Sequence, residues 1–262
     1  TGMHIPALIQ EQNGFAGLTN KKLGSRVQCI CVAYEGMERF FPADRIVMTG
    51  NPIRSIIVPA TPEMKEAGIK EYGLDPSRKH IFIVGGSLGS ARFNQCMKEW
   101  ISDGCPGLDG VDVLWQCGKH YRPDIDRFMD EQRTKNPDVA RHIHHSDFIG
   151  RMELAYAAAD VVISRSGASS VSELCTARKA VIFIPSPNVA EDHQTHNAMA
   201  LVKKDAAVVV KDAEAMEKMI PTALELLKDP ARIARLEENA GKMALPDAAE
   251  KIAEEVYKLI KD

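Results

Sequence analysis

A strand, a turn of small residues and a helix follow one another within residues 159–178, and this run constrains the fold more than any other. Ala159–Ser164 predicts a buried strand, and the serine, glycine and alanine of residues 166–169 allow the backbone to approach a ligand closely. The following helix would offer free amides and the positive end of its dipole, which favour a phosphate. A helix capped by Ser169 or Ser170, with Glu173 in its first turn and no ligand, is the alternative.

Strands and helices alternate along the rest of the chain. This alternation predicts an α/β fold in which a parallel sheet is covered by helices on both faces, the doubly wound arrangement. The expected strands are residues 5–9, 27–33, 43–48, 80–84, 111–116, 141–144, 161–164, 180–184 and 206–210, and the helices of the tail are residues 213–227, 231–240 and 247–260.

Length and charge exclude several classes of function. The 262 residues suffice for one large or two modest domains. A net charge of -3 without a dense basic block argues against a nucleic-acid partner, and no apolar run reaches the length of a membrane span. The six cysteines form no C-x-x-C pair, which favours reduced thiols over a disulfide framework or a zinc site.

A glycine-rich turn, Gly85–Ser90, comes directly after the expected strand at residues 80–84 and opens a helical pattern. Ligands of parallel sheets bind at the carboxyl ends of the strands, where such a turn exposes amides to a pyrophosphate. A nicotinamide site would require an acidic residue at the end of the next strand, but residues 111–116 end in glutamine. The sequence therefore favours a pyrophosphate over a dinucleotide; a turn with only a packing role is the alternative.

Polar side chains gather in residues 185–197, after the expected strand at 180–184. They supply donors and acceptors suited to a hexose, and Glu173 would accept hydrogen bonds from sugar hydroxyls. His193 and His196 have no third ligand nearby, so we expect no metal. A capped helix with solvated polar residues is the alternative. The groups expected to contact a hexose are Asp192, His193, Gln194 and Asn197.

Gly50 and Pro52 break regular structure in Thr49–Arg54, so we place a domain boundary there. Arg54 at this hinge would reach a phosphate with both arms of its guanidinium, or would be a surface arginine. The strand expected at residues 5–9 has only four residues before it, whereas a parallel strand normally has neighbours on both sides. We therefore expect the front of the first domain to be missing from this chain.

Several of these segments, taken together, resemble the MurG family, the UDP-N-acetylglucosamine transferases that make lipid II from lipid I. The resemblance covers nearly all of the chain and implies the GT-B fold: a doubly wound Rossmann-like donor domain plus the C-terminal part of a second Rossmann-like domain. It implies that residues 1–52 are the remnant of the N-terminal acceptor domain, 53–241 the C-terminal UDP-GlcNAc domain, and 242–262 a helix that crosses back. The matching segments are Glu11–Asn20, Thr49–Arg54, Gly85–Ser90, Phe148–Met152, Ser164–Ala168 with Ser172 and Glu173, and Asp192–Ala198.

The resemblance also implies roles for single residues on the donor side. Glu173 would hold the ribose hydroxyls, and Gln194, with His193 beside it, would contact the N-acetylglucosamine hydroxyls. Ser87 and Arg54 would lie near the diphosphate. Ser170 stands where the family usually has threonine, and His193 where some members have glutamine. The whole expected substrate-binding set is Arg54, Ser87, Ser169, Ser170, Glu173, His193, Gln194 and Asn197, with Phe148, Ile149 and Met152 lining the uracil pocket.

On the acceptor side, the resemblance implies that Glu11 and Asn13 face the cleft, and they are the candidate catalytic residues. The implied reaction moves GlcNAc with inversion from UDP-GlcNAc to the 4-hydroxyl of MurNAc in lipid I, without a cofactor or a metal. The family's front glycine-rich loop, which bears a histidine proposed to serve in catalysis, is not in this sequence, so we expect donor binding rather than full turnover. A UDP-sugar-binding module without turnover and a UDP-GlcNAc 2-epimerase-like enzyme are the alternatives.

The same resemblance implies partners and a location. The partners would be UDP-GlcNAc, lipid I and, for the full-length protein, the cytoplasmic face of the bacterial inner membrane, where the protein would be peripheral. No nucleic acid is expected.

Overall fold

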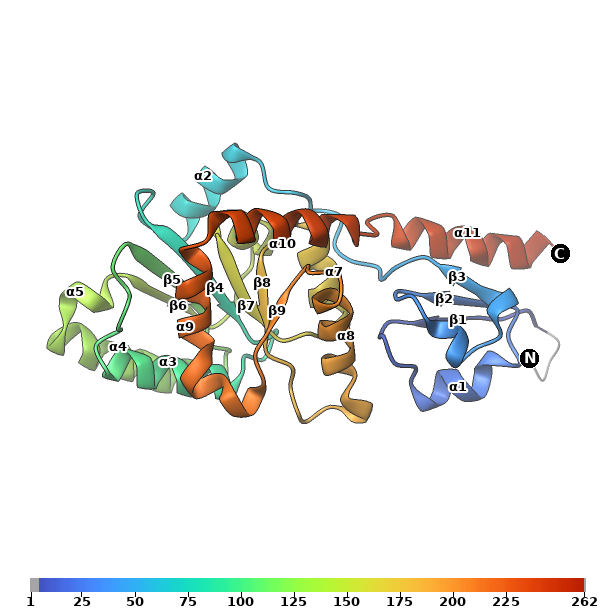
Figure 1. The fold of residues 1–262 in the computed structure, drawn as a ribbon, viewed down its shortest axis with the longest axis horizontal. Helices are drawn as coiled ribbons and strands as arrows, with labels where there is room; N and C mark the ends of the chain where they lie inside the picture. The colour runs from blue at the N-terminus through green and yellow to red at the C-terminus, as the bar shows by residue number, and fades with distance from the viewer. Residues whose placement is uncertain (1–4, 262) are drawn as a thin grey trace.

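The computed structural model describes residues 5–261, which form a large and a small lobe (Figure 1). The small lobe holds a three-stranded parallel sheet in the order β1-β2-β3, with α1 packed beside it. The chain enters the large lobe after β3 and returns towards the small lobe at its end (Figure 1). The elements of the small lobe are β1 (Leu8–Glu11), α1 (Leu18–Gly24), β2 (Cys29–Val32), β3 (Ile46–Met48) and the 3-10 turns η1 (Met37–Arg39) and η2 (Ala43–Arg45).

The large lobe is built on a six-stranded sheet in the order β6-β5-β4-β7-β8-β9, and all of its neighbouring strands are parallel. The order reverses between β4 and β7, which is the point where ligands bind in open sheets of this kind. The strands are β4 (Lys79–Val84), β5 (Val111–Gln116), β6 (Ile143–Ser146), β7 (Val161–Ser164), β8 (Val181–Phe183) and β9 (Val208–Val209).

Helices cover both faces of this sheet and bury a hydrophobic core on each. Alternation along β4 sends Ile81 and Ile83 into one core and Phe82 and Val84 into the other. Burial on both sides explains why these strands read as unbroken apolar runs. The helices are α2 (Pro62–Glu71), α3 (Ala91–Ser102), α4 (Arg122–Lys135), α5 (Pro137–Ala140), α6 (Met152–Ala158), α7 (Ala168–Thr176), α8 (His193–Val202), α9 (Ala215–Leu227), α10 (Pro230–Lys242) and α11 (Ala248–Lys261), with 3-10 turns η3 (Ala190–Asp192) and η4 (Asp212–Glu214).

Several features differ from the expectation. The strand expected at residues 43–48 begins at Ile46, after a 3-10 turn, and the one expected at 141–144 is Ile143–Ser146. The first strand begins three residues later than expected, at Leu8, and Ile5 is 56% exposed. The helix α4 was not anticipated, because its sequence is mostly charged; it buries only Ile125 and Met129 against the sheet. Residues 1–4 and 262, which the expected domains include, lie outside the described residues.

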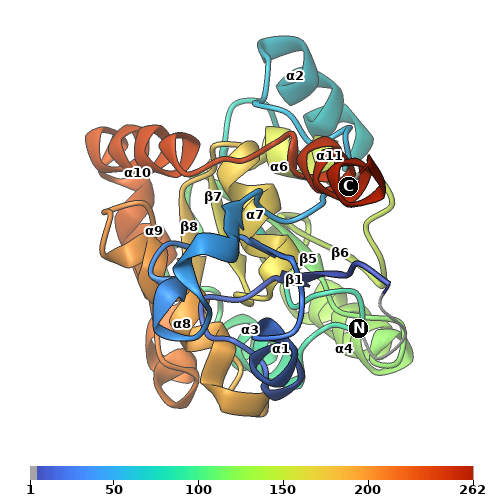
Figure 2. The ribbon, with the colours of Figure 1, turned by 90° about the vertical axis from the view of Figure 1, so that its right-hand side faces the viewer.

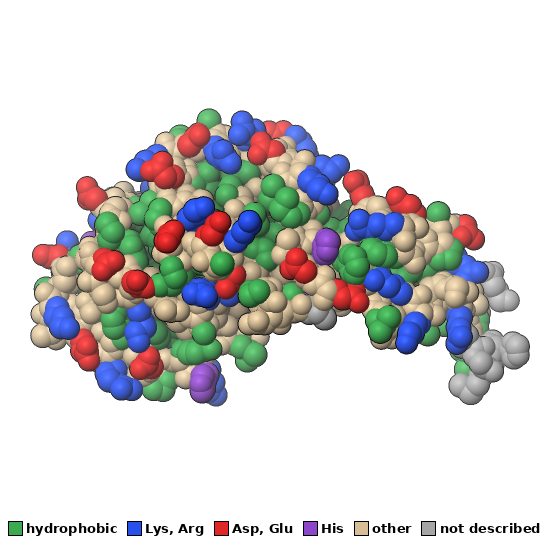
Figure 3. Space-filling view, turned by 60° about the horizontal axis from the view of Figure 1, so that its bottom comes forward, with side chains coloured by type: hydrophobic (Ala, Val, Ile, Leu, Met, Phe, Trp, Pro, Cys, Tyr) green, Lys and Arg blue, Asp and Glu red, His purple; other side chains and the backbone are tan. Residues whose placement is uncertain are grey.

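The end of the chain packs against the small lobe. Helix α11 lies along one side of the small lobe (Figure 1), and both lie towards the viewer when the molecule is seen from that end (Figure 2). The Sγ atom of Cys29, the first residue of β2, lies 3.9 Å from a carboxylate oxygen of Glu255. Gly50, at φ 89°, sits so close to Leu245 that a Cβ atom there would lie 2.6 Å from the leucine Cβ. In space-filling view a narrow waist separates the lobes (Figure 3). Within residues 5–261, none of the helices combines the length and the apolar character needed to cross a bilayer.

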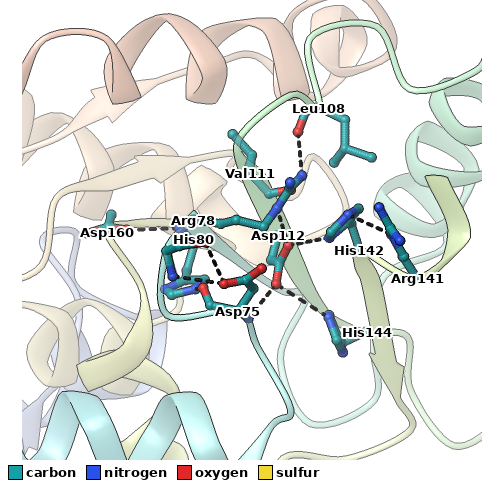
Figure 4. A network of polar contacts seen from close by, with 11 residues as sticks. Asp75, Arg78, His80, Leu108, Val111, Asp112, Arg141, His142, His144 and Asp160 are labelled. Atoms are coloured by element: carbon teal, nitrogen blue, oxygen red, sulfur yellow. Dashed lines mark hydrogen bonds and ion pairs between the residues drawn. The ribbon is translucent and has the colours of Figure 1, made fainter. Parts of the chain in front are cut away.

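A buried carboxylate ties together the amino ends of β4, β5 and β6 (Figure 4). Asp112, 1% exposed, pairs with Arg78 Nε at 2.7 Å and accepts hydrogen bonds from His142 Nδ1 and the Asp75 amide, both at 2.8 Å. His144 Nε2 lies 3.7 Å away. Burial alone raises the pKa of Asp112, but the contacts with His144, the Asp75 amide and His142 outweigh it and hold the pKa below its ordinary value.

We predict that Asp112→Asn destabilises the protein at neutral pH and much less in acid. The folded-state pKa is far below the unfolded value of about 3.9, so this stability is complete above the unfolded value and is lost as the pH falls from there through the folded-state pKa. Breaking a buried pair costs about 3–5 kcal/mol, to be measured by urea unfolding near pH 7 and near pH 2. Asp109→Asn, at an exposed aspartate of the preceding turn, is the control. If the free energy of unfolding of Asp112→Asn differed from that of the wild type by the same amount at both pH values, the stabilising role of the ionised Asp112 would be wrong.

Candidate functional site

A hollow of about 550 Å³ opens at the carboxyl edge of the large sheet, where the strand order reverses. Its walls come from the turns after β4, β7 and β8 and from the first turn of α3. A larger cavity of about 870 Å³ lies between the lobes, between the ends of β2 and β3 and the helices α7, α8 and α10. We place the candidate site in the smaller hollow, because two helix starts and a guanidinium converge on it.

The glycine turn after β4 is shaped by close packing of backbone on backbone. Gly89 has φ 76°, and a Cβ atom on it would lie 2.2 Å from the carbonyl oxygen of Cys117. Gly118 meets the carbonyl of Leu88 in the same way. The turn ends at Ser90, whose Oγ caps α3 by accepting a hydrogen bond from the Phe93 amide at 3.3 Å. The packing role considered for this turn is therefore real, and Gly85, Gly86, Gly89 and Ser90 also line the hollow.

The start of α7 carries no side-chain cap. Its N-cap is Gly167, with extended backbone, whereas Ser169 and Ser170 lie inside the helix. The alternative considered for this turn, a helix capped by one of these serines, is therefore wrong. No side chain occupies the amides of the first turn, which leaves them available to an anion. Ser170 lines the hollow, and Ser169 is exposed and does not.

Arg165, like Arg92 and Asp212, lines this hollow and was missed by our reading of the sequence. It follows β7 directly, and its Nη1 donates to the carbonyl oxygens of Ile184 (2.9 Å) and Pro185 (3.2 Å) and to Asp212 Oδ1 (2.6 Å). Its Nη2 donates to Ser90 Oγ at 3.0 Å. The side chain is 14% exposed and lines the hollow, so a fixed guanidinium lies beside both helix starts. Its position immediately after the strand was the available signal.

Glu173 and Arg54 bind each other. Arg54 Nε lies 3.0 Å from Glu173 Oε1, and Nη2 lies 2.9 Å from Oε2, a bidentate pair. The hydroxyl of Tyr156 donates to Oε2 at 3.3 Å; burial and the charge of Glu173 raise the pKa of Tyr156, so this hydroxyl stays protonated. Neither Glu173 nor Arg54 lines the hollow. The structure therefore places Arg54 on Glu173, and not where a diphosphate in the hollow would lie.

The segment expected to hold uracil follows β6. Ile149 is 1% exposed, Phe148 is 57% exposed, and Met152 begins α6. The Ile149 amide donates to Gln116 Oε1 at 3.3 Å, and Gln116 Nε2 donates to the Gly86 carbonyl at 2.7 Å. Gln116, at the end of β5, thus connects this segment to the glycine turn. Ser87 is exposed in that turn and does not line the hollow.

The polar segment at α8 divides between the hollow and the small lobe. Gln194 lines the hollow; its Oε1 accepts a hydrogen bond from the Ser186 amide at 2.8 Å, which leaves the amide nitrogen to donate to a ligand. His193 opens α8 beside it. Asn197 is fully buried: its Oδ1 accepts from the Gly14 amide (2.8 Å), and its Nδ2 donates to Asn13 Oδ1 (3.0 Å) and the Ser166 carbonyl (3.1 Å). Contact of Asn197 with a hexose does not fit this arrangement, since its amide already joins the lobes.

Glu11 organises a loop. It is 3% exposed, and its carboxylate accepts hydrogen bonds from the amides of Asn13 (3.0 Å) and Gly17 (2.9 Å) and from Asn20 Nδ2 (2.9 Å). A general base must reach the proton that it removes, and a buried carboxylate with three donors does not meet that requirement. Asn13 is half-buried, and its Oδ1 accepts a hydrogen bond from Asn197 Nδ2 at 3.0 Å, so both candidate catalytic side chains have partners within the protein. Within the described residues, no group of three or more His, Cys, Asp or Glu is arranged to hold a metal ion.

Comparison with known proteins gives a consistent picture. The model of the glycosyltransferase family 28 C-terminal domain matches residues 80–252. The UDP-N-acetylglucosamine--N-acetylmuramyl-(pentapeptide) pyrophosphoryl-undecaprenol N-acetylglucosamine transferase of Bacteroides thetaiotaomicron is 47% identical over 98% of this chain and 67% of its own length. The crystal structure of MurG from Acinetobacter baumannii superposes with a TM-score of 0.73 at 26% identity, covering 98% of this chain and 67% of that one. The chain belongs to the MurG family.

The MurG family assignment confirms the expected fold class, because its structural neighbours have the GT-B fold. Anabaena Alr3699/HepE in complex with UDP has a TM-score of 0.62 at 12% identity, covering 97% of this chain and 72% of that one, a likeness of fold alone. The chain spans about two thirds of the length of the curated MurG-family relatives, 67% of the Bacteroides thetaiotaomicron protein and 66% of that of Bacteroides fragilis.

The residues that the MurG-family motifs singled out fall into separate groups in this structure. Ser170 and Gln194 line the hollow together. Glu173 and Arg54 form a pair that does not line it, so Glu173 and Gln194 do not share this cavity. Three residues follow β6: Phe148, Ile149 and Met152. Asn13 and Asn197 lie at the contact between the lobes, and Glu11 is buried within the small lobe. His193 stands beside Gln194, and Ser87 and Ser169 are exposed.

We predict that Gly89→Ala is more destabilising than Gly86→Ala. Both positions have positive φ, where a side chain costs about 1–2 kcal/mol, but only Gly89 would place its Cβ against a backbone carbonyl. The total for Gly89→Ala should be about 2–5 kcal/mol, since overpacking adds to the strain. Urea unfolding of both variants measures the loss of stability. Equal losses would show that the backbone at Cys117 moves away at little cost, which would contradict the prediction.

Proposed function

We propose that this chain binds UDP-N-acetylglucosamine and forms the donor side of an inverting transfer of GlcNAc to the 4-hydroxyl of MurNAc in lipid I, which gives lipid II. The observation that supports this most is the convergence, on one hollow, of the uncapped start of α7, the glycine turn before α3 and the guanidinium of Arg165. Gln194 lies on another wall of the same hollow. A diphosphate with an attached sugar matches this combination of groups.

In this proposal the diphosphate lies against the helix starts and Arg165. Amides and a guanidinium held in place before the reaction stabilise the charge that develops on the departing UDP. Gln194, fixed through Ser186, donates from its amide nitrogen to a sugar hydroxyl. A base must take the proton of the attacking hydroxyl, and the geometry of Glu11 argues against that residue.

The ribose would use the pair formed by Glu173 and Arg54. A carboxylate has about four acceptor positions, so one bound to a guanidinium and a tyrosine hydroxyl still accepts from a ribose hydroxyl. Arg54 then orients Glu173 and does not contact the diphosphate itself. The uracil would stack near Phe148, with the Ile149 amide exchanging Gln116 for the base edge.

A donor-binding module without turnover is the second candidate. The observation that favours it is the burial of Glu11, which is 3% exposed and whose carboxylate accepts its three hydrogen bonds within its own loop, so it is not placed to take a proton from an acceptor hydroxyl. The MurG-family relatives are named for an undecaprenol-linked acceptor. We infer from that name a peripheral position at the cytoplasmic face of the inner membrane. A net charge of -3 without a dense basic block argues against a nucleic-acid partner.

A turnover assay distinguishes the transferase from the donor-binding module. The chain is incubated with UDP-GlcNAc and a lipid I analogue, and UDP release is followed with and without the acceptor. Acceptor-dependent release supports the transferase; tight UDP-GlcNAc binding with no release supports the module. Conversion of the donor to its 2-epimer without acceptor would support an epimerase-like activity, and absence of UDP-GlcNAc binding would overturn the proposal.

We predict that Gln194→Ala weakens UDP-GlcNAc binding about 3- to 10-fold and leaves UDP binding nearly unchanged, because one hydrogen bond to the sugar is lost. Isothermal titration with both ligands measures the two constants. Gln132→Ala, on α4 and outside the hollow, is the matched control. Equal losses for UDP and UDP-GlcNAc would remove Gln194 from the sugar end of the site.

A further inference from the structure

A carboxylate lines the hollow that the proposed function fills with a diphosphate. Asp212 begins η4 after β9, and its side chain is 14% exposed. A carboxylate repels an anion bound beside it, so its presence among helix starts and guanidiniums needs a physical reason. The partners of its two oxygens provide one.

The two oxygens of Asp212 bind two arginines from different elements. Oδ1 accepts from Arg165 Nη1 at 2.6 Å, and Oδ2 accepts from Arg92 Nε at 3.3 Å. Arg165 follows β7, and Arg92 is the second residue of α3, so the two flank the point where the strand order reverses. All three side chains line the hollow. Asp212 therefore connects the cationic groups on the two sides of the crevice.

The balance of charge still favours an anion. One carboxylate between two guanidiniums leaves one positive charge uncompensated, and the starts of α3 and α7 add the positive ends of two dipoles. The stacking of Arg165 on the ring of Phe93, with 4.6 Å from guanidinium carbon to ring centroid, restricts the same guanidinium further. The cations are thus held in place before a ligand arrives, which lowers the cost of ordering them on binding.

We propose that Asp212 is a positioning residue for the diphosphate, which fixes Arg165 and Arg92 in the orientation that binds its oxygens. This inference rests on the proposed function. It concerns a residue outside the motifs that resembled the family, in the connection between β9 and α9. Its effect is confined to the diphosphate, because the base and ribose groups lie on other elements.

The test compares UDP with uridine. Isothermal titration gives both dissociation constants, and the Kd of uridine divided by the Kd of UDP reports the contribution of the diphosphate. We expect Asp212→Ala to reduce this ratio about tenfold by weakening UDP binding, with uridine affinity unchanged, since each misplaced guanidinium forfeits a charge-assisted hydrogen bond. Asp212→Asn should be intermediate, because its amide oxygen still accepts from one arginine. Glu214→Ala is the control: this carboxylate of the same turn pairs only with Lys218 among the described contacts.

Two outcomes would overturn the inference. If Asp212→Ala bound UDP as tightly as the wild type or more tightly, relief of repulsion would dominate and positioning would be wrong. If Asp212→Ala failed to fold in a thermal melt, Asp212→Asn would decide, and an unchanged ratio in that variant would reject the role. A wild-type chain that bound uridine and UDP equally would overturn the proposed function as well, which distinguishes the two failures.

Discussion

The candidate site depends on the parallel pairing of β4 with β7, in which Val84 lies opposite Ser164. Parallel strands end at the same edge, so the turns that follow them meet there. The helix after β4, α3, packs on one face of the sheet, and the helix after β7, α7, packs on the other. The two turns therefore diverge, and the space between them stays open. The hollow is a consequence of this topology, and the side chains determine only what it can bind.

Each fixed cation near the site has an acidic partner from a distant part of the sequence. Arg165 pairs with Asp212, and Arg54 pairs with Glu173. A half-buried guanidinium without such a partner would either move or lose stability. Pairing keeps the groups ordered at the cost of part of their attraction for an anion, and the uncapped start of α7 supplies attraction that needs no counter-charge. The site thus combines ordered side chains with backbone dipoles.

The sequence was sufficient for the central strands and for the turns that line the hollow, but not for the pairing of the side chains around it. β5 was predicted to the residue, because burial on both faces leaves an apolar run with clear ends. α4 was missed because only one narrow side of it is buried. The bond between Arg54 and Glu173 joins residues 119 positions apart, and no local pattern carries such information. Asn197 was predicted as a sugar contact for the same reason: two of its three partners, Gly14 and Asn13, lie in the other lobe.

The side-chain amide of Asn197 also joins the two lobes beside the candidate site. It bonds to Asn13 and Gly14 in the small lobe and to the carbonyl of Ser166, and the hydroxyl of Ser166 donates to the backbone carbonyl of Gln194 at 2.8 Å. Phe15 stacks on His196 at 5.0 Å between ring centroids, so an aromatic contact accompanies the polar one. A buried amide that uses both of its N–H groups and its oxygen has one favourable arrangement, and leaving one of these groups unpaired is costly. Movement of the small lobe must therefore either break these bonds or displace the turn that holds Ser166, which is the turn that opens α7.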